Sequence, residues 1–173
     1  MLWDVSLGNM PGVMSMDYMV REVTNAADVD EVRRLVMAHG DARSTTPGVE
    51  YVYADAARMP GPYIPPLGGL WLAVSADVGI GCGALRPVDD TSAEVKRMFV
   101  DSTWRGRGVG RALMVALIAG ARARGYATLR LGTLDDMTAA RTLYESLGFV
   151  PIGRYRADEL IDTRFYQLEL STT

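Results

Sequence analysis

The chain has 173 residues, 49% hydrophobic and 23% charged, which is the composition of one globular domain. Its formal net charge of −3 at pH 7 gives no general attraction to nucleic acid or anionic membranes, and would accommodate a cationic substrate. With Cys82 as its single cysteine and His39 as its single histidine, the chain offers no intrachain disulfide and no cysteine- or histidine-rich metal site, so no metal is predicted.

Residues 1–16 contain two glycines, a proline and four methionines, and we expect them to form a flexible N-terminal extension. They contain no Lys or Arg, so they lack the charged start of a secretory signal. No apolar run in the sequence approaches the length of a membrane span. These features predict a cytoplasmic protein without a membrane partner and a single domain over residues 17–173.

The first half of that domain predicts a strand, two helices and a β-hairpin. These elements are expected at residues 17–23 (strand), 26–40 and about 49–58 (helices), and 69–75 and 79–88 (paired strands). The first helix begins after Asn25, a suitable N-cap, and is expected to end at Gly40, with His39 as a cation that favours its C-terminus. The prolines in residues 60–66 predict a loop, because proline continues neither element.

The second half alternates strands with helices. Strands are expected at residues 93–100, 128–134, 149–153 and 163–171, with a helix at 108–124 and another ending at Gly148. Asp135 or Asp136 is expected to cap this last helix, which should bury Ala140, Leu143 and Leu147. The order of elements predicts one α/β domain, a mixed central sheet flanked by helices.

The segment from Val100 to Ala112, VDSTWRGRGVGRA, lies where a strand ends and a helix begins. Its glycines allow backbone N–H groups to approach an anion closely, and the helix N-terminus adds partial positive charge. Arginine side chains supply further donors for phosphate oxygens. The residues concerned are Arg105, Gly106, Arg107, Gly108, Gly110 and Arg111. This pattern predicts a pyrophosphate site, although a Gly/Arg surface turn without a ligand stays open.

Two other nucleotide motifs fit this segment poorly. A Walker loop needs Lys followed by Ser or Thr, whereas Arg111 and Ala112 stand there. A dinucleotide fingerprint that starts at Gly106 needs its third glycine at position 111, which is arginine. A Walker-type or Rossmann-type nucleotide domain is therefore disfavoured.

The segment resembles the acyl-CoA loop of the GNAT superfamily of N-acetyltransferases, Arg/Gln-x-x-Gly-x-Gly/Ala, written here as RGRGVG from Arg105 to Gly110. A second motif of that family, A-x-x-LYE-x-LGF, stands at residues 139–149 as AARTLYESLGF. The resemblance covers roughly residues 17–170. It implies a GNAT fold in which two neighbouring parallel strands, residues 94–100 and 128–133, splay apart to admit acetyl-CoA.

The resemblance also assigns cofactor contacts. Backbone groups of Met98, Phe99 and Val100 would pair with the pantetheine arm of acetyl-CoA. The pyrophosphate would be held by the loop and the start of its helix, that is, by Arg105, Gly106, Arg107, Gly108, Val109, Gly110 and Arg111.

Acetyl transfer needs a group that takes a proton from the ammonium and one that protonates the departing thiolate. Tyr144 matches the family's tyrosine beside the cofactor sulfur and is our candidate acid, with packing in the core as the alternative. Glu94 lies where some members carry a catalytic glutamate and is our candidate base. Its alternative is ion pairing with Lys96, Arg97 or Arg86.

The sequence departs from the family at two positions. Met137 stands where many relatives have a cofactor-contacting asparagine, and Gly132 stands where enzymes acting on protein N-termini often have a glutamate. An amine of a small molecule, or a side-chain amine of a peptide, is therefore favoured as the acceptor. A non-catalytic acyl-CoA sensor is the alternative function, and a homodimer is a possible assembly.

Overall fold

A computed structural model describes residues 17–157 and 163–170. The predicted N-terminal extension, residues 1–16, lies outside the described residues. The predicted order of strands and helices is confirmed. The elements are β1 (Met19–Glu22), α1 (Ala26–Ala42), α2 (Glu50–Arg58), β2 (Gly69–Ser75), β3 (Val78–Pro87), β4 (Ser92–Val100), the short 3₁₀ turn η1 (Ser102–Trp104), α3 (Val109–Ala123), β5 (Thr128–Leu134), α4 (Thr138–Ser146), β6 (Val150–Ile152) and β7 (Thr163–Glu169).

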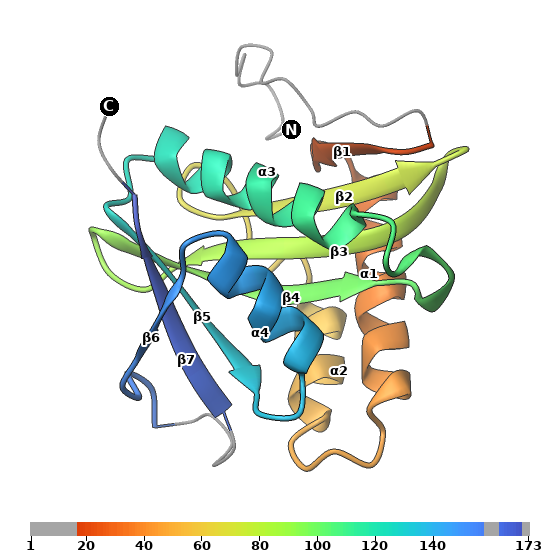
Figure 1. The fold of residues 1–173 in the computed structure, drawn as a ribbon. Helices are drawn as coiled ribbons and strands as arrows, with labels where there is room; N and C mark the ends of the chain where they lie inside the picture. Colours follow the sequence, from red (N-terminus) through yellow and green to blue (C-terminus); the bar gives the residue numbers. More distant parts are fainter. Residues whose placement is uncertain (1–16, 158–162, 171–173) are drawn as a thin grey trace.

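The strands form one sheet in the order β1-β2-β3-β4-β5-β7-β6 (Figure 1). Every neighbouring pair of these strands is antiparallel except β4 and β5, which are parallel and joined through α3. The hairpin turn between β2 and β3 falls at Ala76 and Asp77, whose φ angles of 46° and 64° suit the right-handed twist of the two strands. The mixed sheet predicted from the sequence is thus observed.

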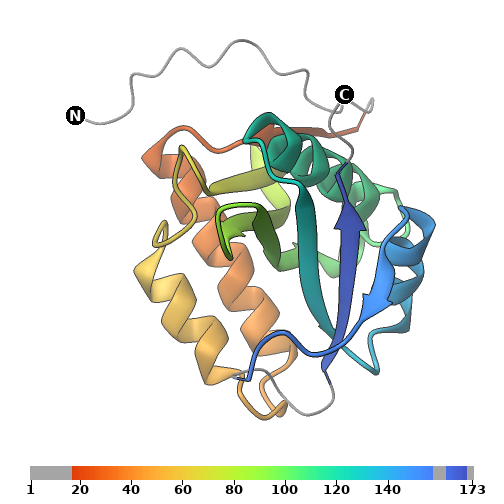
Figure 2. The same cartoon turned by 90° about the vertical axis from the view of Figure 1, so that its left-hand side faces the viewer.

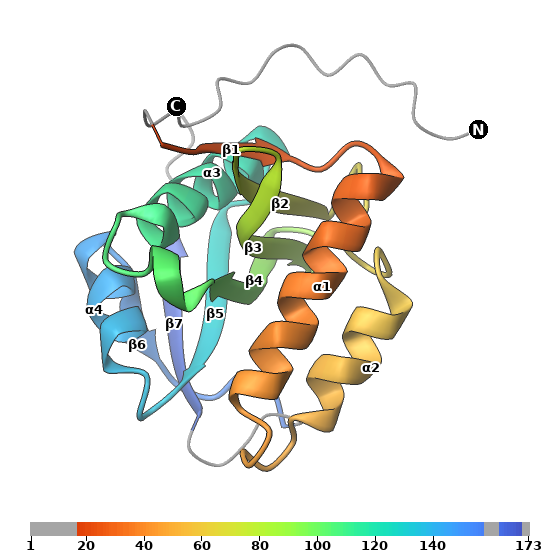
Figure 3. The same ribbon diagram turned by 90° about the vertical axis from the view of Figure 1, so that its right-hand side faces the viewer.

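Helices cover both faces of the sheet. In Figure 3, α3 and α4 lie on one side of the sheet and α1 and α2 on the other, and Figure 2 shows the same division from the opposite side. Each face has its own apolar core: one is built around Leu113, Leu117 and Tyr144, the other around Leu35 and Leu72. Helices α1 and α3 therefore pack on opposite faces of β3 and β4 at the centre of the sheet.

Two predicted helix boundaries differ from the structure. Helix α1 continues through Gly40, where an added Cβ would meet the Tyr53 ring at 2.6 Å, so this glycine permits close packing of α2. Helix α4 is preceded by Met137 and has no side-chain cap, because Asp135 binds Arg141 and Arg164 instead.

The apolar side chains of α4 are less buried than predicted. Ala140, Leu143 and Leu147 are only partly buried against the core, and Tyr144 is the buried residue of this helix. The helix thus presents its tyrosine, rather than its leucines, to the interior.

Candidate active site

The strands β4 and β5 pair only over part of their length. Their ladder runs from Ser92 opposite Thr128 to Val95 opposite Leu131, although β4 continues to Val100 and β5 to Leu134. The strands therefore diverge toward their carboxyl ends, as the resemblance implied. Met98, Phe99 and Val100 have no partner in β5, and Phe99 and Val100 pair with Cys82 and Gly81 of β3, which leaves backbone groups on the β5 side open to an extended ligand.

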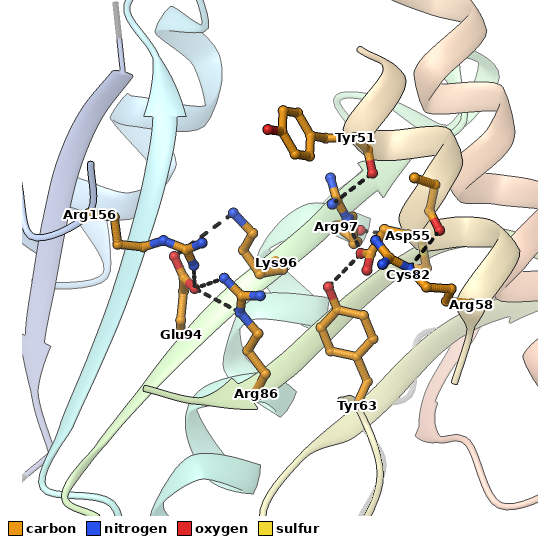
Figure 4. Close-up of polar contacts among 11 residues, drawn as sticks. Tyr51, Asp55, Arg58, Tyr63, Cys82, Arg86, Glu94, Lys96, Arg97 and Arg156 are labelled. Carbon is orange, nitrogen blue, oxygen red and sulfur yellow. Dashed lines mark hydrogen bonds and ion pairs between the residues drawn. The ribbon is translucent and has the colours of Figure 1, made fainter. Parts of the chain in front are cut away.

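A β-bulge in β4 lies at the point of divergence. Arg97 and Met98 stand opposite Gly83 alone, because the register with β3 shifts between Cys82 and Ala84. Arg97 has a φ of 55°, which is unfavourable for a residue with a side chain. The bulge bends β4 away from β5 and turns the Arg97 side chain toward α2, where it binds Asp55 (Figure 4).

The glycine loop between β4 and α3 has the backbone that a phosphate site requires. Gly106 and Gly108 have φ angles of 73° and 83°, and Gly108 is the N-cap of α3 without a side-chain cap. No described residue accepts a hydrogen bond from the backbone N–H groups of residues 106–111. These consecutive donors at the start of a helix form a preorganised anion site.

The arginines of this loop are arranged around it rather than pointing together. Arg105 donates to the Val100 carbonyl at 3.1 Å, Arg107 stacks over the Trp104 ring at 4.2 Å, and Arg111 donates to the Ser146 hydroxyl at 2.9 Å. These contacts hold positive charge near the loop, so an anion bound there would meet a cationic rim.

A cavity of about 320 Å³ opens beside the diverging strands. Its wall combines the end of α1, the following loop, α2, both strands and Tyr144 of α4. The lining residues are His39, Arg43, Thr46, Pro47, Gly48, Val49, Tyr51, Val52, Asp55, Arg58, Arg86, Val95, Lys96, Arg97, Met98, Leu131, Gly132, Thr133, Leu134, Met137, Tyr144, Arg156 and Thr163. The cavity is large enough for a small molecule or one side chain.

Tyr144, the candidate acid, lines this cavity together with Met98, one of the predicted cofactor contacts. Its side chain packs against Phe149 and Tyr166, and its hydroxyl has no hydrogen-bond partner among the described residues. Burial raises the pKa of Tyr144 to about 12, so the phenol is protonated at neutral pH. It combines the packing expected of a core residue with an available proton.

Glu94 is fully buried and lies behind the cavity wall. Its carboxylate accepts hydrogen bonds from Arg86 at 2.8 Å, Arg156 at 2.7 Å and Tyr155 at 2.8 Å, with Lys96 at 3.9 Å (Figure 4). The predicted pairing with Arg86 and Lys96 is therefore present, while Arg97 binds Asp55 instead. Glu94 and Tyr144 belong to the surroundings of one cavity, but only Tyr144 lines it.

His39 lies in the last turn of α1, where we interpreted it as a cation that favours the helix C-terminus. Burial, together with the charges of Arg97, Arg43 and Arg105, lowers its pKa to about 4. Its ring stacks on Phe99 at 5.4 Å, and its buried Nδ1 has no partner among the described residues. His39 is therefore neutral at pH 7, which corrects that interpretation.

Several cavity residues were not identified from the sequence. Arg43, Asp55, Arg58 and Arg156 come from three separate segments, since Asp55 and Arg58 share α2, and no local motif marks any of them. Among the aromatic residues of this region, Tyr51 lines the cavity, whereas Tyr63 and Trp71 are core residues. The described residues contain no group of His, Cys, Asp and Glu side chains placed to hold a metal ion. No helix in the same part of the chain is long and apolar enough to cross a membrane.

Comparison with known proteins agrees with this geometry. Residues 66–151 match the family model for the acetyltransferase (GNAT) domain. N-acetylaspartate synthetase from Danio rerio is 38% identical over 104 residues, which cover 59% of this chain and 37% of that protein. The chain thus spans little more than a third of the length of this curated relative.

Solved structures show the same fold. An acetyltransferase from Streptococcus agalactiae has a TM-score of 0.75 at 23% identity, covering 90% of this chain and 100% of that one. A GNAT family acetyltransferase from Elizabethkingia anophelis, solved with acetyl-CoA bound, has a TM-score of 0.61 at 21% identity, with coverage of 90% and 100%. Together, the family match over residues 66–151, the fold and the two motifs identify a GNAT acetyltransferase domain in this chain.

Proposed function

We propose that this protein is an N-acetyltransferase that moves the acetyl group of acetyl-CoA to a primary amine by direct attack. The observation that carries the proposal is that β4 and β5 diverge. The gap that they leave lies between the glycine loop, with its unpaired N–H groups, and the cavity that Tyr144 lines. A ligand with a phosphate end and an extended amide arm fits this arrangement.

The residues present fit acetyl-CoA as the cosubstrate. The N–H groups of residues 106–111 would hold the pyrophosphate, with Arg105, Arg107 and Arg111 around it. The open backbone edge of Met98, Phe99 and Val100 would pair with the amides of the pantetheine arm. This contact would direct the acetyl group toward the cavity.

In the reaction, the amine nitrogen forms a bond to the acetyl carbon as the carbon–sulfur bond breaks. The departing thiolate takes a proton from the Tyr144 hydroxyl, which has no competing partner among the described residues. Because burial raises the pKa of Tyr144 to about 12, this proton is still in place at neutral pH. The tyrosine regains a proton from solvent after the products leave.

For the base we propose Glu94, acting through water. The carboxylate does not itself line the cavity, and the side chains that bind it, Arg86, Lys96 and Arg156, stand between it and an acceptor. Cations around a carboxylate stabilise its charged form, which weakens it as a proton acceptor. Glu94 can serve this role only if the amine loses its proton readily.

Three finer predictions from the sequence belong to this proposal. The acceptor is an amine of a small molecule or a peptide side chain, the protein works in the cytoplasm, and two copies can form a homodimer. The chemistry above is the same whether the amine belongs to a small molecule or a peptide, and it depends neither on the compartment nor on dimerisation. Each of the three predictions can be measured directly.

The first test is release of the CoA thiol from acetyl-CoA, followed with a thiol reagent against a panel of amino acids, polyamines, aminoglycosides and short peptides. Aspartate belongs in the panel because the name of one relative contains its N-acetyl product. Cys82 contributes no background, because it is fully buried and burial raises its pKa to about 12. Binding of acetyl-CoA without release for any amine would favour the sensor function, and absence of binding would overturn the proposal.

A further inference from the structure

The cavity beside Tyr144 is lined by positive charge, although the whole chain carries a net charge of −3. Six cationic side chains and one carboxylate, Asp55, belong to its described lining. The cations are Arg43, Arg58, Arg86, Lys96, Arg97 and Arg156. Because His39 is neutral, the lining residues that the structure describes include six cations and one anion. The expectation that a cationic substrate would be accommodated therefore does not suit this cavity.

The carboxylates near the cavity are already engaged. Asp55 accepts from Arg97 at 2.5 Å and from the Tyr63 hydroxyl at 2.6 Å, so one oxygen serves two donors (Figure 4). Glu94 is fully buried and bound by Arg86 and Arg156. Glu94 lies behind the cavity wall and the charge of Asp55 is balanced by Arg97, so neither carboxylate adds an uncompensated negative charge that would favour a second ammonium group of a substrate.

Guanidinium donors, in contrast, are available. Arg58 in α2 uses Nε to donate to the Ala54 carbonyl at 3.2 Å, and its two terminal nitrogens have no acceptor among the residues described (Figure 4). Arg97 uses Nε for Asp55 and one terminal nitrogen for a long contact of 3.4 Å to the Tyr51 carbonyl. Arg43 makes only contacts of 3.3 and 3.4 Å to the exposed Asp136. These donors come from three elements and surround one cavity.

We propose that the acceptor is an amine that carries at least one carboxylate, such as an amino acid, and that arginines of the cavity wall, Arg58 among them, bind that carboxylate. This inference rests on the proposed acetyl transfer. An arginine fork matches a carboxylate in two parallel hydrogen bonds, which fixes orientation as well as charge. A polyamine or aminoglycoside would instead bring positive charge into a cationic wall.

The same charge has a chemical consequence. Cations around a bound ammonium favour loss of its proton, so the cavity lowers the pKa of the amine it holds. The substrate carboxylate offsets the repulsion and keeps the molecule bound while the amine becomes neutral. A weak base such as the arginine-bound Glu94 then suffices. The positive wall thus selects the substrate and also activates it.

The test compares L-aspartate with its diamide and with spermidine as acceptors at neutral pH and constant ionic strength. Removing the carboxylates lowers the pKa of the amine, so the diamide has more neutral amine than aspartate at the same pH. A preference for aspartate therefore cannot come from its protonation state. We expect kcat/KM for aspartate to exceed that for the diamide at least about tenfold, with spermidine the poorest substrate.

The variant Arg58→Gln should lower kcat/KM for aspartate about tenfold and leave that for the diamide nearly unchanged. Arg122→Gln is the matched control, because Arg122 is exposed near the end of α3 and lies outside the cavity. Equal use of aspartate and the diamide, or equal losses in both variants, would overturn the proposal. Calorimetric binding of acetyl-CoA should be the same in both variants.

A separate readout applies if no amine is acetylated. Succinate, which has two carboxylates and no amine, should raise the Tm of the protein with CoA bound, and succinamide should not. A Tm rise that is absent in Arg58→Gln would support the carboxylate site even though acetyl transfer had failed. Identical Tm values with succinate and succinamide would overturn the carboxylate site, whether or not turnover is observed.

Discussion

The two ends of the proposed active site are built in different ways. The glycine loop at residues 105–111 is a continuous segment whose donors are backbone N–H groups. The cavity around Tyr144 draws its charged side chains from the end of α1, α2, the two strands β3 and β4 and the segment after β6. One end is a backbone feature and the other is an assembly of side chains.

This difference decides how each end of the site responds to a single substitution. A backbone site depends on a few φ angles, so one substitution at a left-handed glycine removes the whole arrangement. A side-chain site shares its charge among several residues, so the loss of one arginine weakens it while the others remain. The following variants test that contrast, beginning with the largest expected effect on activity.

Gly108→Val should lower the affinity for CoA at least about 100-fold, because a β-branched residue cannot hold a φ of 83° without strain and would disturb the donors at the start of α3. Gly125→Val is the matched control: Gly125 has a φ of 80° at the other end of α3, with open space around its Cα. Calorimetric titration with CoA measures both. Equal loss of affinity in the two variants would mean that the effect is destabilisation, and normal binding by Gly108→Val would refute the loop assignment.

Tyr144→Phe should lower kcat about 100-fold and change the Kd for CoA by less than about threefold, since only a proton donor is removed. Steady-state thiol release and CoA titration provide the two numbers. Tyr166→Phe is the control, because Tyr166 contacts Tyr144, is equally buried and does not line the cavity. A large loss of CoA affinity in Tyr144→Phe would show that the residue is structural.

Glu94→Gln should lower kcat about tenfold at neutral pH, with the loss shrinking as pH rises and the amine deprotonates without help. It should also lower the free energy of unfolding by about 3 kcal/mol, because Arg86 and Arg156 lose their buried counterion.

Glu31→Gln, which removes another arginine partner far from the cavity, is the control for Glu94→Gln. A kcat deficit in Glu94→Gln that is constant across pH would assign Glu94 the role of anchoring the arginines rather than of base.

The variant His39→Gln should change how the stability of the protein depends on pH in acid. The folded pKa of His39, about 4, lies below the ordinary value of 6.5, so the unfolded chain takes up the proton first. The stability that the neutral ring contributes is complete above pH 6.5 and falls by about 2 to 3 kcal/mol as pH drops to 4. Urea unfolding at several pH values should show this slope in the wild type and a weaker slope in the variant.

Much of the fold was predictable because its signals are local. The N-cap at Asn25, the helix predicted at residues 108–124 and the strand predicted at 69–75 all lie within one residue of where the sequence placed them. The two wrong predictions of helix boundaries each concern a single residue. Gly40 stays inside α1 because α2 packs its Tyr53 ring against it, and Asp135 binds two arginines instead of capping α4. In both cases a tertiary contact outweighed a local preference.

The sequence by itself determined the order of the elements, the glycine loop and the position of Tyr144 on α4, because periodicity, glycine placement and short motifs act within one segment. Only the tertiary structure decided that six cations would meet in one cavity of an acidic chain, and that Glu94 would be buried among them. The bulge that turns Arg97 toward α2 and the chain reversal that brings Arg156 to Glu94 depend on how strands pair. Net charge is a sum over the chain, whereas recognition depends on which charges the fold brings together.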